Sequence, residues 1–165
     1  MILSTHAVVG AAIASLMPSH TALAFVSGFA SHFVIDAIPH WDYPLRSILI
    51  TPSDTGRAIT LNWRLCGGLG LVALDACLGV AVALWLYASP TATTAVLLGT
   101  LGAILPDPLR LAYKLWPREP LRTLQRFHGR IHSKRKLGWA IGVTSQLSFV
   151  VLVIAASAAI RVVLA

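Results

Sequence analysis

Histidine and aspartate residues gather in one short stretch, Ser31–Asp42, at the end of an apolar segment. On a helix, His32 and Asp36 lie four residues apart and share a face, and His40 continues that line for as long as the helix lasts. Pro39 is expected to end or kink the helix because it has no amide hydrogen. Imidazole and carboxylate groups on one face are the donors that a divalent metal needs. The alternative is an interfacial rim whose side chains simply prefer lipid headgroups.

A second histidine pair lies in a predicted amphipathic helix that starts near residue 121. Apolar residues occupy one arc of this helix, and arginines occupy the opposite arc: Arg122, Arg126 and Arg130. His128 and His132 fall together at the edge of the apolar arc, one turn apart, which is the spacing of zinc-binding helices. We expect Arg126 and Arg130 to face lipid phosphates or a phosphorylated substrate. The alternative leaves both histidines as rim residues of an interfacial helix.

Three further polar residues lie at or within apolar segments. His6 is near the start of the first segment, and Asp107 directly follows the fourth. Asp75 lies well inside the third, where a carboxylate is costly and usually faces a partner within the bundle. The expected partner of Asp75 is His32 or His6; the alternative is a protonated Asp75 hydrogen-bonded to a neighbouring helix.

The composition indicates an integral membrane protein of one domain. Of the 165 residues, 56% are hydrophobic and 12% are charged, whereas ordinary globular chains carry about 25% charged residues. We predict an all-α helical bundle with five spans and a cytoplasmic interfacial amphipathic helix. The predicted spans are residues 3–17, 21–38, 65–88, 92–105 and 137–160. A polar loop over residues 43–57 follows the second span, and the sequence Pro106-Asp107-Pro108 is expected to end the fourth.

The charge distribution predicts the topology. Basic residues lie only between spans two and three, between spans four and five, and near the C-terminus, whereas the turns at Pro18 and Pro90 carry none. The positive-inside rule therefore places both basic loops and the N-terminus in the cytoplasm, as expected for a multi-pass protein of the cell inner (plasma) membrane. The net charge of +7 then indicates contact with anionic lipid headgroups, and nucleic acid is an unlikely partner. An oligomer or a larger complex stays open.

The order of these motifs resembles a family of bacterial inner-membrane proteins described as metal-dependent hydrolases, some under SOS (LexA) control. The matching positions are His6 with Gly10, Leu105-Pro106-Asp107, and His128-Gly129-Arg130-Ile131-His132-Ser133. Two departures stand out. The family usually has a second aspartate where this chain has Leu109, and its two histidines are typically five residues apart, whereas here they are four apart. The resemblance implies a metal site more strongly than any particular reaction.

The favoured function is hydrolysis of a lipid or amphiphilic ester or phosphoester at the cytoplasmic interface. One or two divalent ions, zinc or manganese, are expected to bind the candidate ligands His6, His32, Asp36, His40, Asp107, His128 and His132. Asp36 or Asp42 would act as the general base towards a metal-activated water. One alternative is a non-enzymatic subunit of a membrane complex, whose histidines bind haem or chlorophyll or only pack. The other is a small transporter with Asp75 and His32 as a proton relay.

Overall fold

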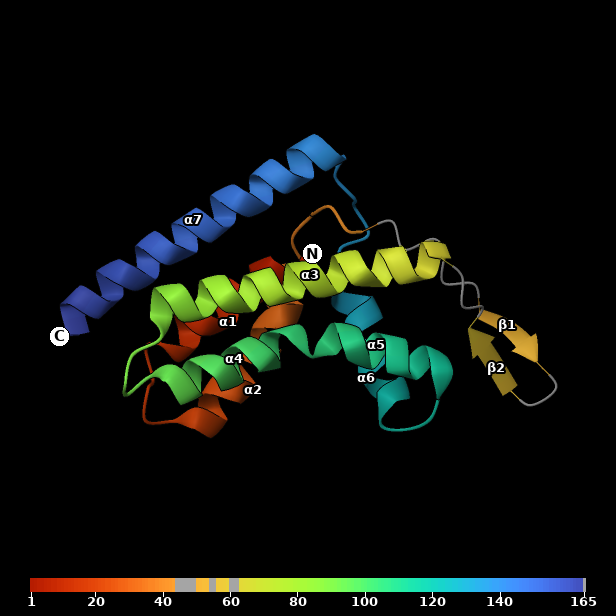
Figure 1. The fold of residues 1–165 in the computed structure, drawn as a ribbon, viewed down its shortest axis with the longest axis horizontal. Coiled ribbons are helices and arrows are strands. Elements are labelled where there is room, and N and C mark those ends of the chain that lie inside the picture. The colour runs from red at the N-terminus through yellow and green to blue at the C-terminus, as the bar shows by residue number, and fades with distance from the viewer. Residues whose placement is uncertain (44–49, 54–55, 60–62, 165) are drawn as a thin grey trace.

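The computed structural model describes residues 1–43, 50–53, 56–59 and 63–164. Over these residues the chain forms seven helices and one β hairpin (Figure 1). The elements are α1 (Leu3–Ala14), α2 (Thr21–Asp36), β1 (Ile50–Ser53), β2 (Gly56–Ile59), α3 (Trp63–Tyr87), α4 (Thr93–Ile104), α5 (Pro106–Leu115), α6 (Leu121–Ile131) and α7 (Trp139–Leu164). The helical character of the chain is thus confirmed.

Helices α1, α2 and α4 form the core of the bundle, with α3 and α7 packed against α1. Glycine allows the three central helices to approach closely. A Cβ atom on Gly28 of α2 would lie 2.1 Å from the backbone oxygen of Gly99 on α4, and one on Gly10 of α1 would lie 2.5 Å from the same oxygen. Close packing through small residues is a common basis of helix association in membranes, where apolar burial offers little driving force between helices.

The length of the helices supports fewer spans than the sequence predicts. In the part of the chain that the structure describes, two helices are long and apolar enough to cross a membrane: Leu65–Tyr87 within α3 and Trp139–Val163 within α7. A third is possible if the bent pair α4–α5 counts as one span. Helices α1 and α2 are apolar but have only 12 and 16 residues, roughly 18 and 24 Å at 1.5 Å per residue, against a hydrocarbon core of about 30 Å. The five-span arrangement is therefore not confirmed.

Helices α3 and α7 also expose large apolar side chains along their length. The most exposed include Leu71, Leu74, Trp85, Val151, Leu152, Val162 and Val163. Apolar surface of this extent marks a face that contacts lipid or another protein. The finding agrees with the membrane class inferred from composition.

The fourth predicted span does end near Pro106, because α4 ends at Ile104, but a further helix that the sequence did not predict follows at once. Helix α5 starts at Pro106, and its axis is bent by 43° from that of α4. Proline is favoured in the first turn of a helix, where its missing N–H has no intrahelical partner to lose. Pro106 therefore bends the chain into a second helix, and this helix carries the basic residues that sequence analysis assigned to a loop. Helix α6 starts at Leu121, as predicted.

Part of the predicted polar loop, residues 43–57, contains the antiparallel β1–β2 hairpin, in which Ile50 pairs with Ile59 and Ser53 with Gly56. Residues 44–49 and 54–55 of that loop lie outside the described residues. The short runs of strand-forming residues are interrupted by Pro52, so the sequence pattern for strands is weak.

The start of α1 donates hydrogen bonds to side chains of two other helices. Ile2 occupies its N-cap and has no side-chain acceptor. Instead, Gln146 of α7 accepts the Ile2 N–H through its Oε1 at 3.0 Å, and Asp75 of α3 accepts the Ser4 N–H at 2.9 Å. A carboxylate at a helix N-terminus also interacts favourably with the helix dipole. These contacts fix the end of α1 that carries His6.

Candidate metal centre

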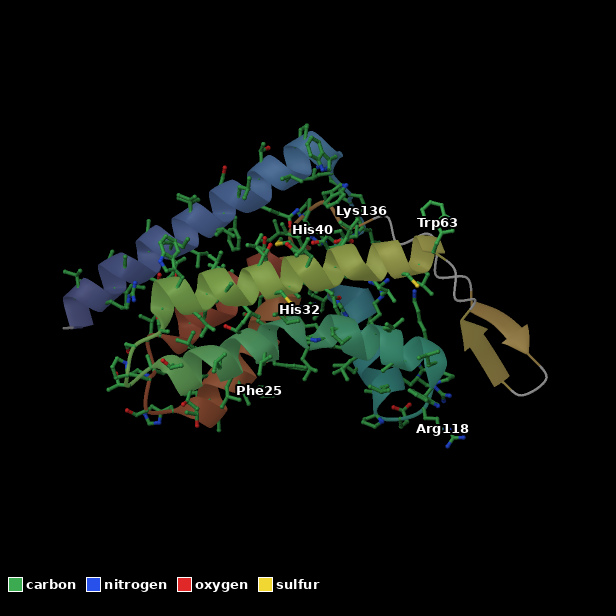
Figure 2. All side chains as sticks on the ribbon, in the orientation of Figure 1. Phe25, His32, His40, Trp63, Arg118 and Lys136 are labelled. Atoms are coloured by element: carbon green, nitrogen blue, oxygen red, sulfur yellow. The ribbon has the colours of Figure 1, made fainter. Side chains whose placement is uncertain are left out.

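Asp36, the last residue of α2, lies at the centre of a cluster of imidazoles. Five histidine Nε2 atoms lie within 3.1–3.7 Å of its two carboxylate oxygens: those of His6, His32, His40, His128 and His132. The carboxylate and four of the five imidazoles are almost completely buried, and His132 is 13% exposed. Figure 2 labels His32 on α2 and His40 just beyond it.

The imidazoles come from three separate parts of the chain. His6 belongs to α1 and His32 to α2, and their rings stack with centroids 4.0 Å apart. His40 lies beyond the end of α2, and the segment around it pairs with residues 136–137 through a parallel bridge and a hydrogen bond from the Leu137 N–H to the His40 carbonyl. This pairing holds the segment that follows α6, including His132, against the end of α2.

Asp42 forms a second acidic group at the edge of the cluster. One oxygen lies 2.8 Å from His40 Nε2 and 2.7 Å from the α-amino group of Met1. The other lies 3.6 Å from His132 Nε2 and accepts a hydrogen bond from Lys136. The same α-amino group lies 2.9 Å from Asp36. Asp42 is 29% exposed, against 1% for Asp36, so it faces the open side of the cluster.

Hydrogen bonds to backbone carbonyls orient three of the imidazoles. Nδ1 of His32 lies 2.8 Å from the Ala103 carbonyl, Nδ1 of His40 lies 2.6 Å from that of Ile38, and Nδ1 of His132 lies 3.2 Å from that of Ser133. A carbonyl only accepts, so Nδ1 carries the proton, and in the neutral ring Nε2 presents a lone pair. Bonds of this kind orient metal-binding histidines in known metal sites.

The inward-facing nitrogens lack enough hydrogen-bonding partners. His32 Nε2, His40 Nε2 and both ring nitrogens of His6 are buried without one among the described residues. Lone pairs that face a carboxylate repel it unless a proton or a cation lies between them. Protonation of every ring would place several positive charges in a buried space with few carboxylates, which burial and mutual repulsion both oppose. A divalent cation accepts the lone pairs of several of these nitrogens at once.

Among the described residues, four groups of three side chains have metal-ligand atoms within 4.8 Å of one another. They are His6–His32–Asp36, His32–Asp107–His128, Asp36–His128–His132 and His40–Asp42–His132. The buried groups could thus hold a metal ion, and the shared residues would let two neighbouring ions have common ligands. Imidazole and carboxylate donors suit zinc, manganese and iron, so the donor set alone does not identify the metal.

All seven predicted metal ligands belong to these groups, although they differ in how closely they contact the centre. Asp107, 31% exposed, lies 3.9 Å from His32. Asp36 contacts every one of the five histidines and is therefore the common element. His132 is the C-cap of α6, where the backbone leaves the helical conformation, so the expected helical pair with His128 forms only in part.

The ionisation of the groups at the open edge suits cation binding. Burial alone would raise the pKa of the Asp42 carboxyl, but the adjacent His40 imidazole, together with the nearby α-amino group and Lys136, holds that pKa well below its usual range. Burial lowers the pKa of the His132 imidazole below its ordinary value, although Asp36 and Asp42 act in the opposite direction. A charged carboxylate and a neutral imidazole are the forms that bind metals.

Asp75 is not part of the cluster. It accepts the Ser4 N–H, and burial together with a hydrogen bond to Asp75 raises the pKa of Tyr43 well above its usual range. The expected contact of Asp75 with His6 or His32 is not among the interactions in the described part of the chain. Asp75 positions α1, and thereby His6, from outside the cluster.

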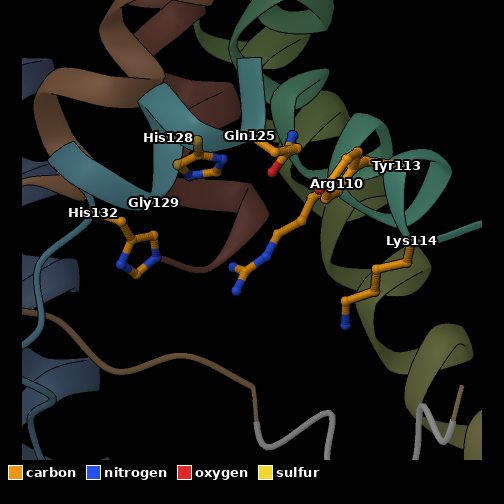
Figure 3. A pocket seen from close by; sticks show the side chains of 7 residues that line it. All are labelled: Arg110, Tyr113, Lys114, Gln125, His128, Gly129 and His132. Atoms are coloured by element: carbon orange, nitrogen blue, oxygen red, sulfur yellow. The ribbon is translucent and has the colours of Figure 1, made fainter. Parts of the chain in front are cut away.

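The predicted substrate-binding arginines, Arg126 and Arg130, are exposed on α6. Next to the cluster lies a pocket of about 220 Å³ between α5 and α6, whose basic side chains are Arg110 and Lys114 (Figure 3). Sequence analysis missed both. The signal was present, because a helix starting at Pro106 places Asp107, Arg110 and Lys114 at spacings of three and four on one face.

Neither a protein-family model, a curated protein nor a solved structure matches this chain.

Proposed function

We propose that this protein is a membrane-bound, metal-dependent hydrolase of lipid or amphiphilic esters or phosphoesters, of the kind that its motifs resemble. The observation that carries the proposal is the convergence of five imidazoles on the buried carboxylate of Asp36. In this proposal the groups centred on Asp36 hold one or two zinc or manganese ions. A divalent cation there supplies Lewis-acid activation of water and of the scissile bond.

The residues of the chain itself have distinct roles in this proposal. Asp36 and the histidines bind the cation, and the backbone carbonyls that accept from Nδ1 keep the rings in position. Asp42 and Lys136 lie at the edge of the open side of the cluster, where water and substrate enter. The exposed apolar side chains of α3 and α7 support membrane association, which favours an amphiphilic substrate.

The two alternative functions are less compatible with the contacts. A haem or chlorophyll ligand needs an imidazole directed at a macrocycle, whereas here the Nε2 atoms converge on one carboxylate. A proton relay between Asp75 and His32 needs contact between them, whereas Asp75 accepts from Ser4, and His32 contacts Asp36.

The metal content of purified variants tests the proposal. His132 belongs to two of the four donor groups, so His132→Ala should lower bound metal at least about tenfold, since even partners outside the first ligand shell change metal affinity by about 10–100-fold. The control is His20→Ala. His20 is exposed at the other end of α2, roughly 24 Å along the helix axis from Asp36. Wild-type protein should hydrolyse a phosphoester reporter, lose that activity to a chelator and regain it with zinc or manganese.

Equal metal content in His132→Ala and His20→Ala, at matched folding, would show that His132 is an ordinary interfacial residue and not a metal ligand. A visible absorption band instead of zinc or manganese would indicate a pigment or haem protein.

We further propose that the metal centre lies on the cytoplasmic side. The basic residues of α5, α6 and the segment before α7 support this orientation through the positive-inside rule. A reporter fused after Lys136 should therefore read cytoplasmic, and one fused after Ala165 should read external, because α7 is long and apolar enough to cross once. The same location for both fusions would exclude α7 as a span.

A further inference from the structure

We propose that the pocket between α5 and α6 binds the terminal phosphoryl group of a phosphate monoester, and that this group is the part of the substrate presented to the metal centre. The proposal rests on the hydrolase function above and specifies its substrate class. With a volume of about 220 Å³, the pocket is smaller than the 300–1,000 Å³ or so of sites that enclose whole drug-sized ligands. It fits a compact head group whose remainder lies outside.

The two positive charges in the pocket favour binding of a dianion. Arg110 and Lys114 lie four residues apart on α5, and like charges at this spacing repel each other. Neither has a carboxylate partner within the part of the chain that the structure describes. Figure 3 shows the Arg110 guanidinium extending into the space between His132 and Lys114. A phosphate monoester carries a charge of about −1.5 to −2 at neutral pH, against −1 for a carboxylate, and guanidinium binds its oxygens in a bidentate manner.

Two further polar groups in the pocket lack partners. Gln125 Nε2 and His128 Nδ1 are buried without a hydrogen-bonding partner among the described residues, and both side chains line this pocket. When Nε2 of the neutral His128 ring binds the cation, Nδ1 carries the proton, so both groups are then buried donors, and a buried donor without an acceptor destabilises the protein. A phosphoryl group offers several acceptor oxygens to the amide, the imidazole and the two cations together. This pattern favours a tetrahedral oxyanion over an apolar occupant.

The pocket is continuous with the metal centre. His128 and His132 line it and also form a donor group with Asp36. A phosphoryl group held by Arg110 and Lys114 therefore lies against the side chains that bind the cation. Hydrolysis there would use one water: its oxygen forms a bond to phosphorus, the ester P–O bond breaks, and a proton from the water passes to the leaving alcohol. The products are an alcohol and inorganic phosphate.

Binding of inorganic phosphate to the full chain in detergent tests the pocket without relying on turnover. We expect Arg110→Gln and Lys114→Gln each to weaken phosphate binding, measured by calorimetry, at least tenfold. Lys134→Gln removes the same charge from an exposed site and should change binding less than twofold. The comparison variant Arg130→Gln removes an arginine from the exposed face of α6. If it weakens binding as much as Arg110→Gln, the phosphate lies on that face and the pocket proposal is overturned.

Two substrate probes distinguish the possible sources of the phosphoryl group. Vesicles with phosphatidic acid in phosphatidylcholine present a lipid monoester, and p-nitrophenyl phosphate presents a soluble one. Arg110→Gln should raise KM for whichever is hydrolysed, whereas metal content should stay at the wild-type level. Arg110-dependent phosphate binding without hydrolysis of either probe would retain the pocket and reject the hydrolase. Metal-dependent hydrolysis that Arg110→Gln and Lys114→Gln leave unchanged would reject the pocket and retain the hydrolase.

Discussion

The two ends of the α1–α2 hairpin are built from different kinds of side chain. At one end, where α1 begins and α2 ends, buried imidazoles surround Asp36. At the other end, Ala14, Ala24 and Ala95 form a small apolar cluster with Met17 at its edge. Between them, glycines bring the helices within backbone contact. The polar end contains the chemistry, but the small residues determine where its side chains lie.

One contact connects the two regions directly. Gly28 is one helical turn before His32 on α2, and Gly99 is one turn before Ala103 on α4. The close approach of Gly28 to Gly99 therefore continues, one turn later, as the hydrogen bond between His32 Nδ1 and the Ala103 carbonyl. Packing in the apolar region thus sets the orientation of a candidate metal ligand. Substitutions in the apolar region and at the polar end can therefore separate the contribution of helix packing from that of the polar side chains.

The largest effect is expected from Gly28→Ala. Its new Cβ would lie 2.1 Å from the Gly99 backbone oxygen, so the helices must separate, at a cost of about 1–3 kcal/mol in unfolding free energy for an overpacked core. Metal affinity should fall as well, because His32 moves with α2. The measurements are reversible unfolding in detergent and zinc affinity by competition with a chromophoric chelator.

Gly70→Ala is the matched control, because a Cβ there meets nothing within 4 Å. It should leave metal affinity unchanged and stabilise the helix by about 0.5–1 kcal/mol. If Gly28→Ala lowers stability but keeps full metal affinity, the packed region does not position the polar end.

Much of the fold follows from the sequence because apolar segments and their breaks are local features. The helices that match the predicted spans begin and end within a few residues of the predicted limits. The number of spans does not follow, because composition does not fix where each apolar helix ends: α1 and α2 have 12 and 16 residues, fewer than the predicted spans over residues 3–17 and 21–38. Helix α5 was missed because Pro106 was interpreted as a stop rather than as the first residue of a new helix.

The candidate ligands were predictable by residue type, but their roles were not. Histidines and aspartates at the same end of several apolar segments must meet if the segments form a bundle. Which carboxylate lies at the centre depends on how the segment after α6 pairs with His40, and no local pattern encodes that pairing. The histidine partner expected for Asp75 is not found, whereas a hydrogen bond to a neighbouring helix, the alternative, is present at Ser4 of α1. Sequence could not name Ser4, because Asp75 accepts from a backbone N–H, which is present at every residue except proline.

A loss of stability of intermediate size is expected from substitution of Asp75, which lies where the polar and apolar regions meet. Asp75→Leu removes the acceptor of the Ser4 N–H and should destabilise the protein by about 0.5–2 kcal/mol, the range found for lost helix caps. Asp75→Asn keeps a carbonyl oxygen for that N–H and should remain close to wild type in stability. Thermal unfolding of the two variants side by side makes the comparison. If Asp75→Leu and Asp75→Asn lower the unfolding temperature equally, the charge of Asp75, rather than its hydrogen bond, stabilises the start of α1.

The smallest loss of stability is expected from substitution of Tyr87, which lies in the apolar region of the bundle. Its hydroxyl lies 2.9 Å from Ser157 Oγ and connects α3 to α7. Tyr87→Phe keeps the ring, and Ser157 still donates to the Ile154 carbonyl, so no buried donor is left without an acceptor. Hydrogen bonds between membrane helices average about 0.6 kcal/mol, and the loss of unfolding free energy should be of that size. Metal affinity should not change, since Tyr87 packs in an apolar cluster with Ala11 and Ala12 of α1, away from Asp36 and its histidines at the polar end. A marked loss of metal affinity in Tyr87→Phe would mean that α7 positions the cluster through its whole length, rather than through Gln146 at its polar end.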